Sequence, residues 1–222
     1  EDKIMNFNSI NSKIKNKKID FDGNLSINPF DLNLNINLGD YKLLKLLNIN
    51  SVLGEIIKTE LLFNKNISVN TILTINSELR KEIFNNVNIN FNIINGKINF
   101  NKTRLINKKI GSLELERSNL YLKNNTMILN TDIIIDINNY DELFSLLQTN
   151  KKFRKPIKSV RINIDYNFLI NQVTFNNIKV DNKKVSDELS RILEDFNDNN
   201  FDNWNKSKRL LNILFESYEG EG

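Results

Sequence analysis

The sequence predicts a mainly β protein: a long antiparallel β-meander curled into a groove or taco-like sheet, with short connecting helices and two C-terminal helices. Three observations support this prediction. Apolar residues alternate with polar ones over many segments, Asn-rich turns separate those segments, and helical spacing replaces the alternation near the C-terminus. Alternation of period two gives a strand one apolar and one polar face, and a sheet of such strands buries the apolar face.

The clearest element is a hairpin over residues 86–100. Its first run, NVNINFNI, alternates four apolar residues with asparagines, and Ile98 and Phe100 resume the alternation. Asn95-Gly96 lies between the runs, and both residues of a two-residue hairpin turn must tolerate positive φ. An AT-rich genome would encode much Asn and Ile, so the in-phase placement of these residues, rather than their abundance, supports a folded β protein.

The remaining elements follow from the same rules, with Gly, Asn and Pro marking the breaks. We expect one β domain over residues 1–181 and a helical tail over 182–222 that packs on or caps the sheet. Before the hairpin we expect an edge strand or frayed lead-in at 1–18, strands at 19–27 (with a bulge or turn at Asp22-Gly23-Asn24), 32–38 and 61–75, helices at 41–47 and 51–57, and a helical turn at 77–84. After the hairpin we expect strands at 113–116 and 120–122, separated by a turn at Ser118-Asn119, then a strand at 127–137 and a helix at 140–147. The last expected elements are strands at 160–170 and 173–180, with a bulge at Asn176-Asn177, and helices at 185–196 and 204–218.

The composition argues against catalysis. The chain contains 0 His and 0 Cys, so it lacks the usual acid–base group at neutral pH and any thiol nucleophile or thiolate ligand. Three carboxylate pairs share a strand face, and because that face is opposite the apolar one, we interpret it as a solvated outer surface: Asp20/Asp22, Glu114/Glu116 and Asp132/Asp136. No phosphate loop or metal-ligand spacing occurs. We therefore expect no enzyme, no cofactor and no metal.

The charge pattern is only mildly basic. Lys and Arg number 31 against 27 Asp and Glu, a net charge of +4. This dispersed charge argues against a nucleic-acid partner. The densest basic segment, around Lys151, Lys152, Arg154 and Lys155, fits a solvated loop, which is the simpler interpretation, or a contact with anionic lipid head groups.

The apolar stripes leave two interpretations open. They form either the core of an ordinary β-sandwich or a groove that acyl chains fill. The candidate groove residues share the apolar phase of their strands: Leu32, Leu34, Ile36, Val87, Ile89, Phe91, Ile93, Ile133, Ile135, Ile162, Ile164 and Phe168.

The run from Phe84 to Leu189 resembles the C-terminal region of AsmA-like proteins, the bacterial envelope family that includes the TamB and YhdP relatives. The resemblance consists of an apolar hairpin, a Gly-led strand, a β-meander and an upstream strand followed by a Leu-rich helix. The matching residues are Phe84, Val87, Ile89, Phe91, Asn95-Gly96-Lys97-Ile98, Gly111-Ser112-Leu113, Leu120–Leu122 and Ile133–Ile137, with Leu38-Gly39-Asp40, Leu43, Leu44, Leu46 and Leu47 upstream.

This resemblance implies a periplasmic, non-enzymatic domain whose hydrophobic β-groove carries phospholipid between the inner and outer membranes. It also implies an inner-membrane anchor upstream of this chain, and an AT-rich bacterial source fits the composition. The two-helix tail has no counterpart in the family pattern, and we expect it to contact a membrane or envelope protein. The alternative is a structural or adhesive β-domain of an envelope or surface protein with a conventional packed core.

Overall fold

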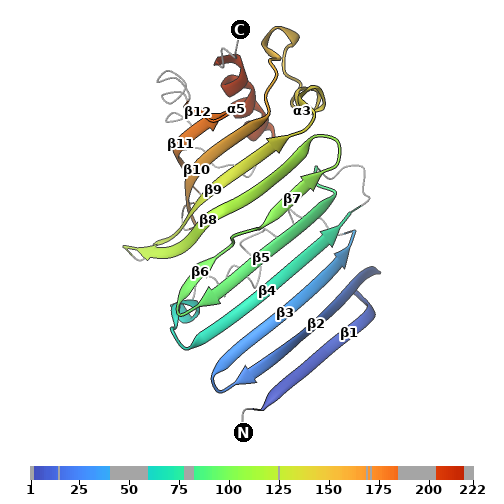
Figure 1. The fold of residues 1–222 in the computed structure, drawn as a ribbon, viewed down its shortest axis with the longest axis vertical. Coiled ribbons are helices and arrows are strands. Elements are labelled where there is room, and N and C mark those ends of the chain that lie inside the picture. The colour runs from blue at the N-terminus through green and yellow to red at the C-terminus, as the bar shows by residue number, and fades with distance from the viewer. Residues whose placement is uncertain are drawn as a thin grey trace. The chain divides into compact units, whose positions relative to one another are not determined.

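A computed structural model describes residues 3–14, 16–40, 60–77, 83–124, 126–168, 170, 172–184 and 204–217. The helices expected at 41–47, 51–57 and 185–196, and most of the turn expected at 77–84, lie outside these residues. Within them the chain is mainly β, with a mostly antiparallel sheet, short helices and one helix near the C-terminus, which confirms the predicted fold class (Figure 1).

Twelve strands and four short helical segments make up the described chain. The strands are β1 (Ile4–Ile14), β2 (Lys17–Ile27), β3 (Phe30–Gly39), β4 (Ile67–Asn76), β5 (Asn86–Ile94), β6 (Lys97–Asn99), β7 (Arg104–Asn107), β8 (Gly111–Lys123), β9 (Thr126–Ile137), β10 (Ser159–Asn167), β11 (Gln172–Val180) and β12 (Lys183–Lys184). The helices are α3 (Tyr140–Leu147) and α5 (Trp204–Ser217), and the 3₁₀ turns are η1 (Glu60–Phe63) and η2 (Lys151–Phe153).

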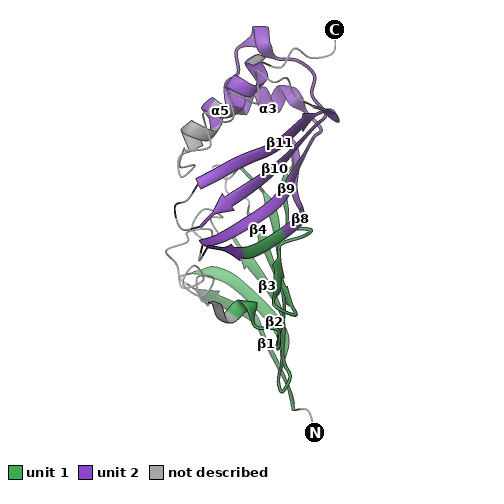
Figure 2. Cartoon of the chain, turned by 90° about the vertical axis from the view of Figure 1, so that its left-hand side faces the viewer, with its two compact units in different colours: residues 1–107, 119–121 green, residues 108–118, 122–222 purple. Residues whose placement is uncertain are grey.

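The chain divides into two compact units (Figure 2). Unit 1 comprises residues 1–107 and 119–121, and unit 2 comprises residues 108–118 and 122–222. Strand β8 contributes residues to both units, so this division falls within a strand. The predicted boundary at residue 181 stays a prediction.

Unit 1 pairs its strands in the order β1-β2-β3-β4-β5-β6, and β7 pairs with β5. All these pairs are antiparallel except β3–β4, which run parallel with Phe30 opposite Ile67. The predicted antiparallel meander is present in the other pairs, and the prediction was wrong only for β3–β4. A parallel pair requires a long connection that returns the chain to its starting end, and residues 40–66 provide that length.

The predicted hairpin is present as β5 and β6. Asn95 and Gly96 form its turn with φ of 53° and 72°, the left-handed values that both residues of such a turn require. A Cβ on Gly96 would also lie 2.4 Å from the carbonyl oxygen of Phe63, so the neighbouring backbone requires glycine here as well. The hairpin is therefore determined locally and supported by η1.

Strand β2 passes through Asp22-Gly23-Asn24 without a break, so the bulge or turn expected there was wrong. Gly23 lies directly opposite Phe7 of β1 and Leu34 of β3. The Phe7 ring covers Gly23: a Cβ there would lie 2.8 Å from the ring and 2.3 Å from the carbonyl oxygen of Asn33. Glycine at this position marks a close approach rather than a turn.

Unit 2 places α3 and α5 on the same side of β9, β10 and β11 (Figure 2). Asn139 caps α3 by accepting a hydrogen bond from the backbone N–H of Glu142 at 3.1 Å, and Gln148 ends it in the left-handed conformation. Phe144 and Leu147 of α3 and Leu214 and Phe215 of α5 are buried in one cluster with strand residues. The helices predicted at 140–147 and 204–218 are thus both present, and they cover an apolar sheet face.

Two strands of unit 2 continue through a position where the alternation of apolar and polar residues shifts by one residue. β8 continues through Ser118-Asn119, where a turn was expected, because Arg117 takes φ of 50° and shifts the alternation by one residue. The bulge predicted at Asn176-Asn177 is confirmed, since Asn163 pairs with Asn177 and Ile164 with Phe175.

Strand β10 ends earlier than expected. Its last residue is Asn167, and Phe168 lies in the turn that follows, where its N–H bonds the carbonyl oxygen of Met127 at 3.0 Å. The predicted extension of the strand to residue 170 was therefore wrong.

Candidate functional site

The apolar face of unit 1 consists of cross-strand rows of side chains that are aliphatic except for Thr71 and Phe91. Directly opposite residues on paired strands share a face. The rows are Leu32–Val69–Ile93, Leu34–Thr71–Phe91, Ile36–Leu73–Ile89 and Leu38–Ile75–Val87. Seven of the predicted groove residues, from Leu32 to Ile93, therefore lie together on β3 and β5.

Burial differs along this face. Val87 and Ile93 are fully buried, and Leu38, Ile75 and Val87 form a packed cluster. Leu32, Leu34, Ile36, Ile89 and Phe91 are only half-buried. The cluster's described neighbours are residues of the same sheet together with Phe84. One end of the face therefore has a core, while its middle remains partly accessible to solvent.

The apolar face of unit 2 is covered by helices. The predicted residues Ile133, Ile135, Ile162 and Ile164 lie here on β9 and β10, and the last two are buried. Phe144 of α3 and Phe215 of α5 meet above them edge to face, with ring centroids 5.2 Å apart. These four candidates thus belong to a helix-covered core.

Phe168 is the exception among the predicted residues. It lies beyond the end of β10 and is half-buried. Its ring packs edge to face against Tyr166 at 4.7 Å. Burial raises the pKa of the Tyr166 hydroxyl. Phe168 therefore belongs to an aromatic pair at the strand end.

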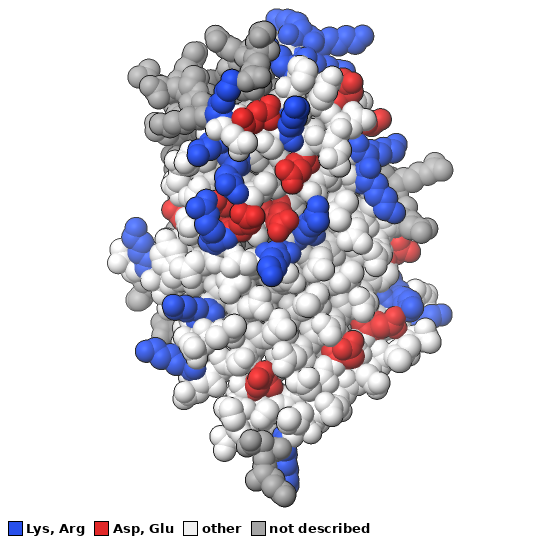
Figure 3. All heavy atoms as spheres, in the orientation of Figure 1, with Lys and Arg blue, Asp and Glu red and all other residues white. Residues whose placement is uncertain are grey.

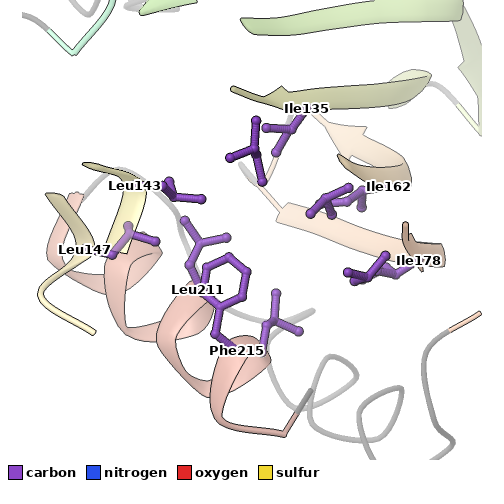
Figure 4. A pocket seen from close by; sticks show the side chains of 11 residues that line it. Ile135, Leu143, Leu147, Ile162, Ile178, Leu211 and Phe215 are labelled. Carbon is purple, nitrogen blue, oxygen red and sulfur yellow. The ribbon is translucent and has the colours of Figure 1, made fainter. Parts of the chain in front are cut away.

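A cavity of about 60 Å³ lies between the helices and the sheet of unit 2. Figure 4 shows Leu211 and Phe215 of α5 directed toward Ile162 and Ile178 of the strands. All the lining residues are aliphatic or aromatic: Ile135, Ile137, Leu143, Leu147, Val160, Ile162, Ile178, Val180, Leu211, Leu214 and Phe215. An empty void of this size costs about 1.4 kcal/mol at about 24 cal/mol per Å³.

Two polar contacts fix α5 beside α3. The Asn212 side chain donates to the carbonyl oxygen of Leu147 at 3.0 Å, and its Oδ1 lies 2.6 Å from the buried Thr149 hydroxyl. These bonds join the last turn of α3 to the middle of α5. Because hydrogen bonds are directional, these two contacts favour one position of α5 along α3.

The basic loop, defined by Lys151, Lys152, Arg154 and Lys155, follows α3 directly. Lys151 and Lys152 are exposed, whereas Arg154 and Lys155 are half-buried. The Arg154 Nε donates to the carbonyl oxygen of Thr149 at 3.0 Å, and the Lys152 ammonium lies 4.5 Å from the centre of the Phe153 ring. The loop therefore presents cations to solvent beside the Thr149–Asn212 contact.

The polar face of unit 2 holds a charged network over β8–β11. Figure 3 shows acidic and basic side chains gathered over β8–β10. Asp132 pairs with Arg117 and accepts a hydrogen bond from Asn163 at 2.7 Å. In the Arg161–Glu116 pair, at 3.1 Å, both side chains are partly exposed, the carboxylate included. The prediction that Asp132 is solvated was wrong: it is 2% exposed, because its neighbours cover it.

The polar face of unit 1 carries a feature that the sequence analysis missed. Six asparagines form one row across six strands: Asn6, Asn24, Asn33, Asn70, Asn92 and Asn99. Within it the Asn33 amide donates to Asn24 Oδ1 at 3.1 Å. The alternation predicted that Asn33 and Asn92 point to the polar face. The alignment of the six asparagines in one row depends on the register of the strands, and the alternation does not specify that register.

No group of three His, Cys, Asp or Glu suited to a metal occurs among the residues that the structure describes. No helix in the described ranges is both long enough and apolar enough to cross a bilayer. No protein-family model matches the chain, and no curated protein matches it either.

Proposed function

We propose that the apolar face of unit 1 binds phospholipid acyl chains, and that the chain acts as a non-enzymatic AsmA-like periplasmic domain contributing to phospholipid transport between inner and outer membrane. The observation that supports this most is the half-buried middle of the face, with Leu32, Leu34, Ile36, Ile89 and Phe91. Contiguous accessible apolar surface of this kind is typical of ligand grooves and interaction sites.

The dimensions of the strands suit this ligand. A strand of ten residues, such as β3, is about 33 Å long at about 3.3 Å per residue. The hydrocarbon core of a bilayer is about 30 Å thick, so the acyl chain of one leaflet extends about 15 Å. One acyl chain thus fits along a strand, in contact with the rows of aliphatic side chains.

Native mass spectrometry of the purified chain tests the proposal. We expect phospholipid to co-purify with the wild type. Leu34→Glu should reduce the bound fraction at least tenfold, because it introduces a carboxylate into the middle of the apolar face. Asn70→Glu is the matched control: it adds the same charge to the polar face of β4 and should retain lipid. A chain without lipid, or equal loss in both variants, would refute the proposal.

The second candidate is a structural or adhesive β-domain with a conventional core. The helix-covered face of unit 2 favours it, because Phe144 and Phe215 there make the close contacts of an ordinary interior. On this hypothesis the chain carries no lipid, and Leu34→Glu lowers stability without changing any bound mass.

A further inference from the structure

The polar face of unit 1 is hollowed over its first three strands. The hollow has a volume of about 360 Å³ and is open to solvent. Two rows of polar side chains line it, Asn6–Asn24–Asn33 and Asn8–Asp22–Asn35, together with Phe7 and Gly23, which lie between the rows. Side chains alternate along a strand, and Leu34 of the apolar face lies between Asn33 and Asn35. The hollow therefore lies on the opposite side of the sheet from the surface proposed to bind acyl chains.

Hydrogen bonds within the hollow orient four of its side chains. The Asn33 amide donates to Asn24 at 3.1 Å, and the Asn35 amide donates to Asp22 at 2.9 Å. Asn33 also donates to the Asp31 carboxylate at 3.2 Å. An amide side chain offers two N–H donors and a carbonyl acceptor, and these bonds use only part of that capacity. The hollow therefore presents donors and acceptors to a ligand from partly fixed positions.

The charge around the hollow disfavours an anionic ligand. Among the described residues of its lining, Asp22 is the only charged one, and none is Lys or Arg. Asp20 and Asp31 follow on the same face of β2 and β3, one at each end, and Lys18 beyond Asp20 is paired with it. An anion would therefore meet carboxylates without a cation of the lining to balance it. The ligand that suits this surface is uncharged and rich in hydrogen-bonding groups.

We propose that this hollow binds one hexose unit of a neutral carbohydrate. Its volume of about 360 Å³, against about 30 Å³ for a water molecule in the liquid, has room for about twelve groups of that size, the number of heavy atoms in a hexose. Neighbouring hydroxyls of a sugar ring offer a donor and an acceptor side by side, and one amide matches both with its N–H and its carbonyl oxygen. The two rows are about 6.6 Å apart along a strand, and the strands are about 4.8 Å apart, so several amides reach a single ring.

A glycan array probed with the fluorescently labelled chain tests this inference. We expect retention by neutral glycans that end in a hexose, and none by the sialylated or sulfated forms of the same glycans. Retention should persist at high salt, because the ligand carries no charge to be screened. Retention by no neutral glycan, or retention only by anionic forms at low salt, would overturn the inference. Bound lipid is a separate measurement on the same protein, so failure of the hollow would leave the proposed function of unit 1 intact.

A pair of double variants locates the site. Asn8→Ala with Asn35→Ala removes two exposed amides of the lining and should weaken the retained glycan about tenfold or more in a calorimetric titration, because the hydrogen bonds to the sugar are lost. Asn66→Ala with Asn70→Ala is the matched control, since it removes two exposed amides at β4 that do not line the hollow. The control should keep its affinity within about twofold.

The wild-type protein gives the location independently of any variant. In side-chain amide NMR, the signals of Asn24 and Asn33 should shift on titration with the retained glycan, whereas that of Asn70 should not. Unchanged affinity in a folded Asn8→Ala/Asn35→Ala protein, judged by its thermal melt, would show that the glycan binds elsewhere. Equal weakening in both double variants, or shifts that omit Asn24 and Asn33, would likewise overturn the site.

Discussion

The two units carry the same alternating pattern on their strands, but the apolar side is covered differently in each. In unit 2, α3 and α5 pack onto β9–β11 and bury Ile162 and Ile164. In unit 1, Leu34 and Ile36 of the corresponding face are half-buried within the described residues. The alternation therefore determines which side chains share a face, while the elements packed on that face determine whether protein covers it.

The largest expected effect lies in the helix-covered core. Phe144→Ala removes a ring that is 0% exposed and packs against Phe215, so it should destabilise unit 2 by about 3–5 kcal/mol. Leu34→Ala on the half-buried face should cost about 1 kcal/mol, since less area returns to water. Urea unfolding followed by tyrosine and tryptophan fluorescence measures both. Equal costs would show that the two faces are equally buried.

The charged network should show a second contrast, between two arginines of unit 2. Arg117→Ala removes the cation, itself 71% exposed, from the nearly fully buried Asp132 carboxylate and should cost about 1–3 kcal/mol. Arg161→Ala breaks a pair whose side chains are 44% and 45% exposed, and it should cost about 0–1 kcal/mol. Unfolding at low and high salt checks the ranking. A larger cost for Arg161→Ala would contradict it.

Gly23 tests how tightly the sheet of unit 1 is built despite its partly accessible face. Gly23→Ala places a methyl group against the Asn33 carbonyl oxygen and the Phe7 ring and should destabilise unit 1 by about 1–3 kcal/mol. Gly39→Ala is the matched control, because its Cβ would make ordinary contacts, 3.4 Å or more from Lys18. Equal melting temperatures for the two variants would show that the sheet adjusts at Gly23.

Much of the fold follows from the sequence because alternation and turn chemistry are local. The hairpin at Asn95-Gly96 and the helix at residues 140–147 could be predicted in this way. So could the face on which each groove candidate lies, except for Phe168, which lies beyond the end of β10. The parallel β3–β4 pair could not, because pairing depends on where a long connection returns the chain. Nor could the burial of Asp132 or the division of the candidates between two units, since both depend on neighbours distant in sequence.

The smallest expected effect concerns Asp20 on the polar face of unit 1. The hydrogen bond from Lys18, at 3.0 Å, lowers the pKa of Asp20, and the backbone N–H of Asn11 adds to the effect. Since the pKa is lower in the folded state, the stability it contributes is present above the unfolded-state value and is lost as the pH falls through the folded-state value. Carboxyl NMR titration should show that Lys18→Gln raises the pKa of Asp20, whereas Lys13→Gln, which removes the cation opposite Lys18, should change it less. An equal response to both variants would mean that general charge, rather than the specific bond, lowers the pKa. In that event the exposed Lys18–Asp20 pair of unit 1 would differ in mechanism as well as in size from the Arg117–Asp132 pair, whose carboxylate is buried.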